Sequence, residues 1–552
     1  MAISKAYKPV VRAKSDNLAG AALVGTNSAI IGWTMDAKKR PKDLRGFSLK
    51  RTDFDPNTGD VERIDWLKGQ KRFKAARGSV ETDVRSDEAP FQRFRWSDYT
   101  LKPGRAYLYE VFPMTGKPGS LKKGDPLKFN MRPSYNSEGG IGIYSNRGVT
   151  AASAYLRRFG GRKPNEVENN EAFNWLERGL KQSLLDFIES AKAGEALHVS
   201  IYEFFNEEVA VAFKAAKKKG VDVRIVYHAK AGKKATRENE AVLSHFGLKS
   251  VATPRSNTKI SHNKFVVHLN KRSKPMRLWT GSANFSDNAF YYQTNVAMVF
   301  EKLELAAAYE DYWQILNGNP TRTKTKDRVI ALHQRFEDSP PPPAKRLMFS
   351  PVRNQHVVQT AMDLIKEAKS ALFLSAPFGI GSDIINEIEA NNPDIIEYGL
   401  ANAVAKKKIE GLRRANTRFF TPSRLETYMG RRWDAAAFGA HKIHAKTLII
   451  DPWSNNPSVL IGSANFSKPS CVANDENSLL VRGDKRFAAM ITTEFMRMYD
   501  HYKIRYWIKK LNAGDAKATQ YLDETSKWAD IYFRRSKFSR KFRDREVFSG
   551  SQ

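Results

Sequence analysis

The sequence contains very little cysteine and no long apolar run. Cys471 is the single cysteine among 552 residues, which excludes an intrachain disulfide and a cysteine-rich zinc site. No stretch approaches the roughly 20 apolar residues that span a bilayer, and the basic N-terminus lacks the apolar stretch of a secretory signal. We therefore expect a soluble protein of the cytoplasm, with signal-less export left open.

Acidic residues are few relative to basic ones. The chain has 92 Lys and Arg against 59 Asp and Glu, which gives a formal net charge of +33 at pH 7. A positive field of this size favours polyanions, either nucleic acid or an anionic membrane surface. A chain that is basic only for solubility would have the same composition, so charge alone does not identify the partner.

The remaining composition is typical of a folded protein with several domains. Hydrophobic residues make up 41% and aromatic residues 11% of the chain, which is enough to bury substantial cores. Short alternating segments separated by turn signals in residues 1–160 predict strands and an antiparallel sandwich. Within this region, residues 94–113 resemble part of a fibronectin type III-like module.

Helical and strand-like patterns alternate from about residue 165. Strand–helix–strand units of this kind imply an α/β fold with a largely parallel sheet covered on both faces. Four consecutive prolines interrupt the pattern, which then starts again and indicates a duplicated unit. The elements predicted here are helices over 173–188, 207–219 and 357–369, and strands over 196–202, 221–227, 371–376 and 395–400.

The chain therefore divides into five predicted segments. They are a sandwich-like domain at 1–160, a first α/β repeat at 165–338, a proline-rich linker at 339–344, a second repeat at 345–488, and a C-terminal helical, basic and aromatic segment at 489–552. In this last segment aromatic rings alternate with seven basic residues between 533 and 545. Such a tail can bind a nucleic-acid backbone or dock on the body of the protein, and the sequence leaves both open.

One constellation of polar residues occurs once in each repeat. His262-Asn-Lys264 precedes a Gly-Ser-Ala-Asn-Phe-Ser string, and His444-Ala-Lys446 precedes an identical string at nearly the same spacing. Because strand side chains alternate, residues two apart are expected to share a face. The side chains that the two strings add are Ser282 and Asn284 in the first, and Ser463 and Asn465 in the second.

This set of side chains suits phosphodiester chemistry. One imidazole can attack phosphorus and carry a covalent phosphoryl group, while the other protonates the leaving oxygen and then activates water. Lysine and asparagine can stabilise the charge that grows on the other oxygens. The fixed cations take the place of a metal, so the residues predict neither a metal site nor a cofactor.

The paired motifs resemble those of the phospholipase D superfamily, His-x-Lys-x4-Asp followed by Gly-Ser-x-Asn. The resemblance implies two pseudo-symmetric α/β/α repeats that form one catalytic unit, with His262 as nucleophile and His444 as acid. It also assigns catalytic roles to Lys264, Asn284, Lys446, Asn465 and Asp451, and substrate binding to Ser282 and Ser463.

The first motif departs from this pattern at two places. Leu269 stands where the family has Asp, and Asp451 fills that position in the second motif. Glu476 resembles the family's carboxylate that orients a catalytic imidazole. The first repeat has no carboxylate there, and we expect Thr294 or Gln293 to substitute. The lone strand histidines His198 and His268 are predicted to be structural.

The substrate stays open among three classes. A nuclease acting on DNA or RNA fits the positive charge and is favoured. A phospholipase D acting on phospholipid head groups is the alternative, and its sign would be an apolar, Trp- or Phe-rich rim around the site. The third class is an inactive polyanion-binding protein, which the intact motifs disfavour. The partner is therefore nucleic acid or a phospholipid surface, and two motifs in one chain make a dimer unnecessary for catalysis.

Overall fold

A computed structural model describes residues 6–74, 83–148, 153–336, 345–402, 417–420, 427–428, 431–432, 443–515, 518–535 and 540–551. The predicted proline-rich linker lies outside the described residues. No helix within these ranges is both long enough and apolar enough to cross a membrane.

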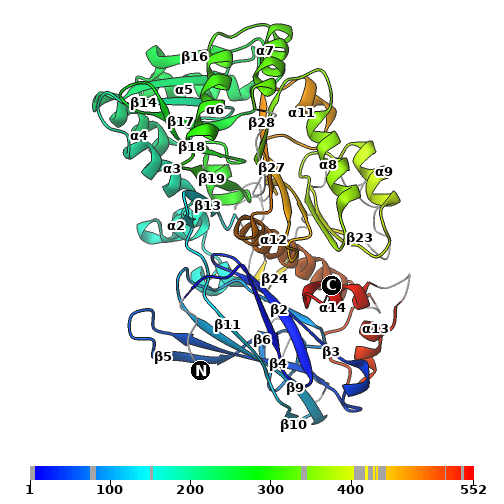
Figure 1. Cartoon of the computed structure of the whole chain (residues 1–552). Helices are drawn as coiled ribbons and strands as arrows, with labels where there is room; N and C mark the ends of the chain where they lie inside the picture. Colours follow the sequence, from blue (N-terminus) through cyan, green and yellow to red (C-terminus); the bar gives the residue numbers. More distant parts are fainter. Residues whose placement is uncertain are drawn as a thin grey trace.

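The N-terminal region is β-rich, as predicted (Figure 1). One antiparallel sheet has the order β1-β2-β3-β8, and a second has the order β10-β9-β4-β5 with β11 also on β9. Alternating apolar residues of both sheets meet in one core that includes Trp33, Phe47 and Tyr109. The strands are β1 (Val10–Lys14), β2 (Leu18–Val24), β3 (Ala29–Met35), β4 (Gly46–Phe54), β5 (Val61–Trp66), β8 (Arg95–Asp98), β9 (Tyr107–Lys117), β10 (Ser120–Lys123) and β11 (Leu127–Met131).

The two sheets that follow have the same strand order. The first is β12-β13-β19-β18-β17-β14-β15-β16 and the second is β20-β28-β27-β26-β21-β22-β23, so the two match strand for strand from β13 and β20 onward. The strands of the first are β12 (Ser137–Glu138), β13 (Ile141–Ser145), β14 (Ala196–Ile201), β15 (Asp222–His228), β16 (Ala252–Arg255), β17 (Lys264–Leu269), β18 (Pro275–Gly281) and β19 (Val296–Phe300). Those of the second are β20 (Lys345–Ser350), β21 (Ala371–Ser375), β22 (Ile396–Leu400), β23 (Thr417–Phe420), β26 (Lys446–Ile450), β27 (Ser458–Gly462) and β28 (Glu476–Arg482).

The prediction of a largely parallel sheet is wrong. In each sheet only the strand–helix–strand part is parallel, as β14-β15-β16 and β21-β22-β23, and the other described pairs are antiparallel. The motif strands cause this, because β17 and β18, like β26 and β27, follow one another through connections too short for a parallel crossover. The sandwich-like region is also shorter than predicted, since β13 pairs with β19 of the first repeat.

Helices cover the outer faces of both sheets and fill the space between them (Figure 1). On the outer faces, α3 (Leu180–Glu189), α4 (Glu207–Lys218) and α5 (Lys234–His245) pack on the first sheet, and α8 (His356–Glu367) and α9 (Ser382–Ala390) pack on the second. The core between the inner faces contains α6 (Leu303–Asn317) and α12 (Lys485–Asn512). The single helix predicted over 173–188 is divided into α2 (Glu171–Glu177) and α3, because Arg178 and Gly179 adopt positive φ values of 46° and 84°.

The C-terminal segment docks on the body of the protein. Helix α14 (Lys541–Phe548) packs against β3, and the Phe533 ring joins the core of the N-terminal sheets. The guanidinium of Arg545 lies 4.4 Å from the Phe533 ring, and Arg535 forms an ion pair with Asp394 of the second repeat. In the described part of this tail, aromatic rings and several basic groups therefore serve docking.

Candidate active site

The two histidine motifs meet because each repeat extends a short segment onto the other. Ser261 forms a parallel backbone bridge with Asp475, and Thr294 forms one with Ile443. The backbone N–H of His262 donates to the Asp475 carbonyl at 2.8 Å, and that of His444 donates to the Thr294 carbonyl at 3.1 Å. The segment before each histidine is thus held by the segment after the Gly-Ser string of the opposite repeat.

Each imidazole is oriented by a side chain from the opposite repeat. Nδ1 of His262 lies 2.8 Å from Oε2 of Glu476, and Nδ1 of His444 lies 2.8 Å from Oδ1 of Asn295. The amide of Asn295 donates through Nδ2 to the Ala289 carbonyl at 2.9 Å, so its oxygen is the atom presented to His444. Both histidines therefore use Nδ1 for support and keep Nε2 for chemistry.

The expectation that Thr294 or Gln293 orients the second imidazole is wrong, because Asn295 does so. Thr294 contributes its backbone carbonyl to the His444 segment, and Gln293 donates its backbone N–H to the Asn288 carbonyl. Counted from the Gly-Ser strings, Asn295 occupies the place of Glu476. This equal spacing, 14 residues from the glycine of each string, is the signal in the sequence that marks Asn295.

The motif serines hold the orienting groups. Oγ of Ser282 donates to Oδ1 of Asn295 at 2.8 Å, and Oγ of Ser463 donates to Oε2 of Glu476 at 2.7 Å. Both hydroxyls are buried and also accept a backbone N–H from the next strand. The serines therefore position the imidazoles indirectly, through Asn295 and Glu476. Their role in binding substrate stays a prediction.

The motif glycines allow two strands to approach closely. A Cβ on Gly281 would lie 2.2 Å from the Val296 carbonyl oxygen, and one on Gly462 would lie 2.3 Å from that of Asn477. Backbone atoms cannot move aside cheaply at such a distance. Glycine at both positions is thus what allows the serines to reach the orienting groups.

The motif lysines are the first residues of β17 and β26, and both are buried. Nζ of Lys264 donates to the His262 carbonyl at 2.5 Å, whereas Nζ of Lys446 has no hydrogen-bond partner in the part of the chain that the structure describes. Lys264 lies 5.3 Å from the Tyr202 ring and Lys446 lies 5.2 Å from the Phe378 ring. Each histidine precedes its strand, so it reaches the junction of the two repeats from the loop, and its lysine reaches it from the strand end. We call this junction, where the motif residues of both repeats gather, the cleft.

Burial and crowded positive charge set the protonation of the cleft. The pKa of His262 is held well below its ordinary value by burial and then by Lys264 and Lys446, and the pKa of His444 is lowered by burial and the same two lysines. Burial lowers the pKa of Lys264 to about 7 and raises that of Glu476 to about 7. An anion bound among these groups would relieve the repulsion.

The asparagines differ in their surroundings. Nδ2 of Asn284 donates to Oε2 of Glu203 at 2.6 Å, and the Oδ1 atoms of Asn284 and Asn465 are buried with no hydrogen-bond partner among the described residues. Glu203 follows β14 and its pKa is raised by burial. By strand register the corresponding residue after β21 is Phe378, whose ring lies 5.3 Å from His444 and is 40% exposed. The two halves of the cleft are therefore chemically unequal, with a carboxylate on one side and an aromatic ring on the other.

Two further residues that the sequence did not single out support the loop before His262. Nδ1 of the buried His228 accepts the Ser261 N–H at 3.2 Å. Burial lowers the pKa of His228 to about 4, so this nitrogen stays an acceptor. Arg255 forms a fully buried ion pair with Asp475 at 2.9 Å. No repeated motif marks either residue.

Asp451 lies outside the cleft, and its predicted catalytic role is not supported. It follows β26, at the opposite end of that strand from Lys446, so roughly 16 Å of extended chain separates the two. Its carboxylate accepts the backbone N–H groups of Lys369, Ser370 and Ala371 at 2.8 Å. The residue ties two strand ends together, and this explains why Leu269 can occupy the matching place. His198 and His268 pair with Glu310 and Glu195, in agreement with the structural role predicted for them.

Comparison with known proteins adds a family match. The model of a family described as "Cardiolipin synthase, PLD-like domain" matches residues 184–316 and 362–499, which contain both histidine motifs and both Gly-Ser strings. A comparison with curated proteins finds no match.

Several solved structures are similar to parts of the chain. Nuc from Salmonella typhimurium, a phospholipase D family member, is 28% identical over 25% of this chain and 85% of its own, with a TM-score of 0.22. Phosphatidylserine synthase from Haemophilus influenzae is 12% identical over 63% of this chain and 94% of its own, with a TM-score of 0.42. Yeast tyrosyl-DNA phosphodiesterase is 12% identical over 55% of this chain and 86% of its own, with a TM-score of 0.34.

Proposed function

Given that this chain belongs to the phospholipase D superfamily of phosphodiesterases, we propose that it is a nuclease that hydrolyses DNA or RNA through a phosphohistidine. The observation that carries the chemistry is the crossed support of two imidazoles through Nδ1, beside two buried lysines. The choice of nucleic acid rests on the net charge of +33, since a polyanionic strand complements it.

In the first step, Nε2 of His262 attacks phosphorus. A P–N bond forms, the P–O bond to the leaving group breaks, and His444, charged once the substrate phosphate offsets the two nearby lysines, gives its Nε2 proton to the departing oxygen. The carboxylate of Glu476 stabilises the positive charge that develops on the His262 ring. Lys264, Lys446, Asn284 and Asn465 are proposed to bind the non-bridging oxygens.

In the second step, water attacks phosphorus and gives its proton to Nε2 of His444. The P–N bond breaks and neutral His262 is restored. Glu476 suits the nucleophile because a carboxylate counters imidazolium charge, and Asn295 suits the acid because its amide oxygen orients the ring without holding its proton too strongly. Neither step uses a metal ion, and the metal independence of the reaction stays a prediction.

A phospholipid substrate is the second candidate. The exposed ring of Phe378 beside His444 is one element of the apolar rim that such a substrate would need. The assay that separates the candidates presents plasmid, single-stranded DNA, RNA and phosphatidylcholine vesicles in EDTA. Nucleic-acid cleavage that falls steeply with salt and is lost in His262→Ala and His444→Ala would support the nuclease, and vesicle hydrolysis alone would refute it.

The covalent step has its own test. A p-nitrophenyl phosphodiester has a leaving group that needs no acid, so His444→Ala should form the phosphohistidine and hydrolyse it slowly. Intact mass should then show an adduct that peptide mapping places on His262, with none in His262→Ala. An adduct on His444 in the His262→Ala protein would reverse the two roles.

A further inference from the structure

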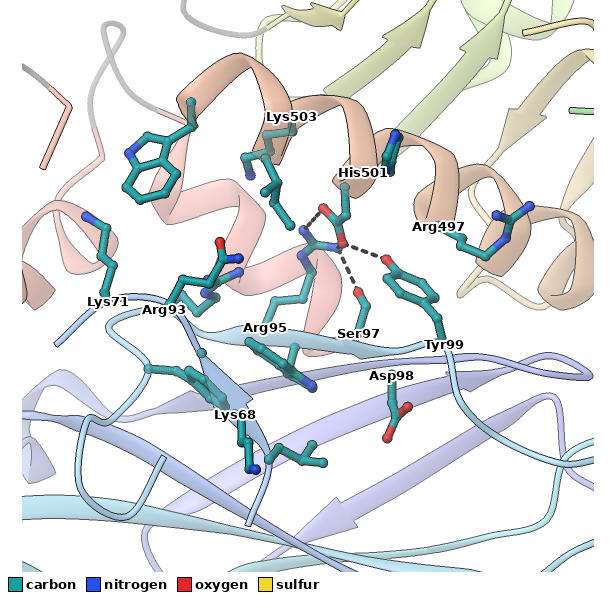
Figure 2. Close-up of a pocket in the computed structure, with 18 of the residues that line it drawn as sticks. Lys68, Lys71, Arg93, Arg95, Ser97, Asp98, Tyr99, Arg497, His501 and Lys503 are labelled. Carbon is teal, nitrogen blue, oxygen red and sulfur yellow. Dashed lines mark hydrogen bonds and ion pairs between the residues drawn. The ribbon is translucent and has the colours of Figure 1, made fainter. Parts of the chain in front are cut away.

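A large hollow lies between the N-terminal sheets and helix α12. Its volume is about 1000 Å³, at the upper end of the range for ligand pockets, and none of the described catalytic residues lines it. Its walls come from β8, from the segment around β6 (Lys68–Gly69), from the C-terminal half of α12 and from α14. Figure 2 shows α12 on one side of this cavity and the N-terminal strands on the other.

The lining is strongly basic. Eleven Lys and Arg side chains line the cavity against four Asp, and the Asp side chains already have partners. Asp500 pairs with Arg95 at 2.8 Å, and Asp98 pairs with Arg51 at 2.9 Å. The two others are Asp83, which pairs with Arg157, and Asp544, which accepts from Tyr398. The lining as a whole thus keeps an excess of positive charge.

Two of these cations stand close together and unpaired. Among the described residues, the side chains of Lys71 and Arg93 have no hydrogen-bond or ion-pair partner. Figure 2 draws both at the same end of the cavity. The pKa of Lys71 is lowered by burial and then by the positive charges of Arg93 and Lys541. An anion bound between them would be attracted by both positive charges.

Flat aromatic rings lie beside the free cations. Trp96 is stacked on Phe91 with ring centroids 3.9 Å apart, and the Arg93 guanidinium lies 5.3 Å from the Trp96 ring. Nζ of Lys71 lies 5.8 Å from the ring of Trp507. Trp96 and Trp507 are both partly exposed. Unpaired cations that alternate with accessible rings are the combination by which proteins bind single-stranded nucleic acid, with phosphates on the cations and bases on the rings.

We propose that this cavity binds a single-stranded segment of the nucleic-acid substrate, with Lys71 and Arg93 on backbone phosphates and Trp96 and Trp507 against bases. The inference rests on the proposed nuclease function for the class of its ligand. A membrane surface fits less well, because a hollow between two domains is recessed from a flat bilayer. Binding here would hold a strand apart from the cleft and raise affinity for long substrates over short ones.

The test compares a double variant with a matched control. The full chain carrying His262→Ala, so that the probe is not cleaved, is titrated into a fluorescein-labelled 12-residue oligothymidylate at fixed salt. Lys71→Glu with Arg93→Glu is compared with Lys122→Glu with Arg272→Glu, two exposed cations that do not line the cavity. Fluorescence anisotropy should show at least a tenfold weaker Kd in the cavity variant and less than a twofold change in the control.

Further measurements separate the possible failures. In the otherwise wild-type chain, the cavity variant should hydrolyse bis(p-nitrophenyl) phosphate at the unchanged rate, which shows that the fold and the cleft are intact. Equal affinities of the cavity and control variants would overturn the proposed binding site in the cavity and would leave the proposed nuclease function intact. If neither parent nor control binds the oligonucleotide, both proposals fail. Loss of binding to phosphatidylglycerol vesicles, with oligonucleotide binding retained, would assign the cavity to lipid and overturn the inference.

Discussion

At the scale of single residues, the cleft keeps groups that destabilise the fold. Lys446 is 1% exposed, and its ammonium has no hydrogen-bond partner among the residues that the structure describes. Burial and the charge of Lys264 hold its pKa well below the ordinary value. A buried, unpaired cation is costly in the empty site, and the same cation becomes useful when a phosphate enters.

We predict that Lys446→Met abolishes activity and stabilises the protein, by about 2 kcal/mol in the free energy of unfolding at pH 6. Because the folded-state pKa is depressed, the unfolded chain binds more protons at pH values between the two pKa values, so wild-type stability rises with pH there. The advantage of the Lys446→Met variant should therefore be smaller at pH 9 than at pH 6. Urea unfolding of both proteins at both pH values measures this difference in the free energy of unfolding.

Lys122→Met is the control for this prediction, since Lys122 is exposed and removal of its charge should leave stability nearly unchanged. If the Lys446→Met protein unfolds more easily than wild type at both pH values, the account of Lys446 as a destabilising group is contradicted.

The second prediction at this scale concerns Glu476. Its pKa is raised to about 7 by burial, and it must lose its proton to support charge on His262. The kcat/KM of the wild type should therefore rise as pH increases through about 7. Glu476→Gln should lower kcat by about 10- to 100-fold and remove this limb of the pH–rate profile, because the amide does not ionise.

Asp451→Asn provides the comparison for Glu476→Gln. Its carboxylate ties strand ends far from the cleft, so the variant should lose stability and keep the wild-type limb. If the pH–rate profiles of Glu476→Gln and wild type coincide, Glu476 does not support the charge on His262.

At the scale of elements, the end of β16 fixes the start of β28. Arg255 is the last residue of β16 and forms a fully buried ion pair with Asp475. Asp475 directly precedes Glu476, the first residue of β28. The Asp475 carbonyl also accepts the N–H of His262. One ion pair between the repeats thus sets the positions of His262 and of Glu476, the carboxylate that orients it.

We predict that Arg255→Met destabilises the protein by about 3–5 kcal/mol, because it leaves a carboxylate buried and uncompensated. The double variant Arg255→Met with Asp475→Leu should recover most of the thermal stability, since no charge is then left buried. Activity should stay low in the double variant, because Glu476 loses its fixed position. Differential scanning calorimetry with a phosphodiesterase assay checks both parts, and a single variant as stable as wild type would contradict them.

The sequence predicted elements better than their arrangement. Hydrophobic periodicity located β14, α4, β21 and α8 within one or two residues, because local pattern determines an element. It missed the break at Arg178 and Gly179, since apolar spacing continues across it. It also gave the wrong strand direction, because direction depends on which strands pair and not on their composition.

The residues of the candidate site were likewise easier to predict than the contacts between distant segments. Both histidines, both lysines and both asparagines were predicted from repetition, and crossed contacts bring the two histidine motifs together where the repeats meet. Asn295, Glu203, His228 and Arg255 were not, since their roles arise from contacts between segments far apart in the chain. A motif records only spacing along the chain, so it did not show that Asp451 lies at the far end of β26, where it accepts backbone N–H groups.

At the scale of the whole molecule, the two duplicated sheets face each other, and each repeat supplies the side chain that orients the histidine of the other. Glu476 of the second repeat orients His262 of the first, and Asn295 of the first orients His444 of the second. α6 and α12 fill the core between the two sheets, so the repeats form one body. Neither repeat holds a complete half-site, and the catalytic unit is built within a single chain.

This architecture predicts how inactive variants behave when mixed. His262→Ala and His444→Ala each lack one imidazole of the pair that a chain contributes to its cleft. If the cleft were shared between chains, an equimolar mixture would form some sites with both histidines and recover activity. Because the crossed supports close within one chain, we expect the mixture to show no more activity than the sum of the two variants alone. The assay uses the p-nitrophenyl phosphodiester, with wild type at half concentration as the reference. Recovery that grows with protein concentration or with prior co-refolding would show that the repeats exchange between chains.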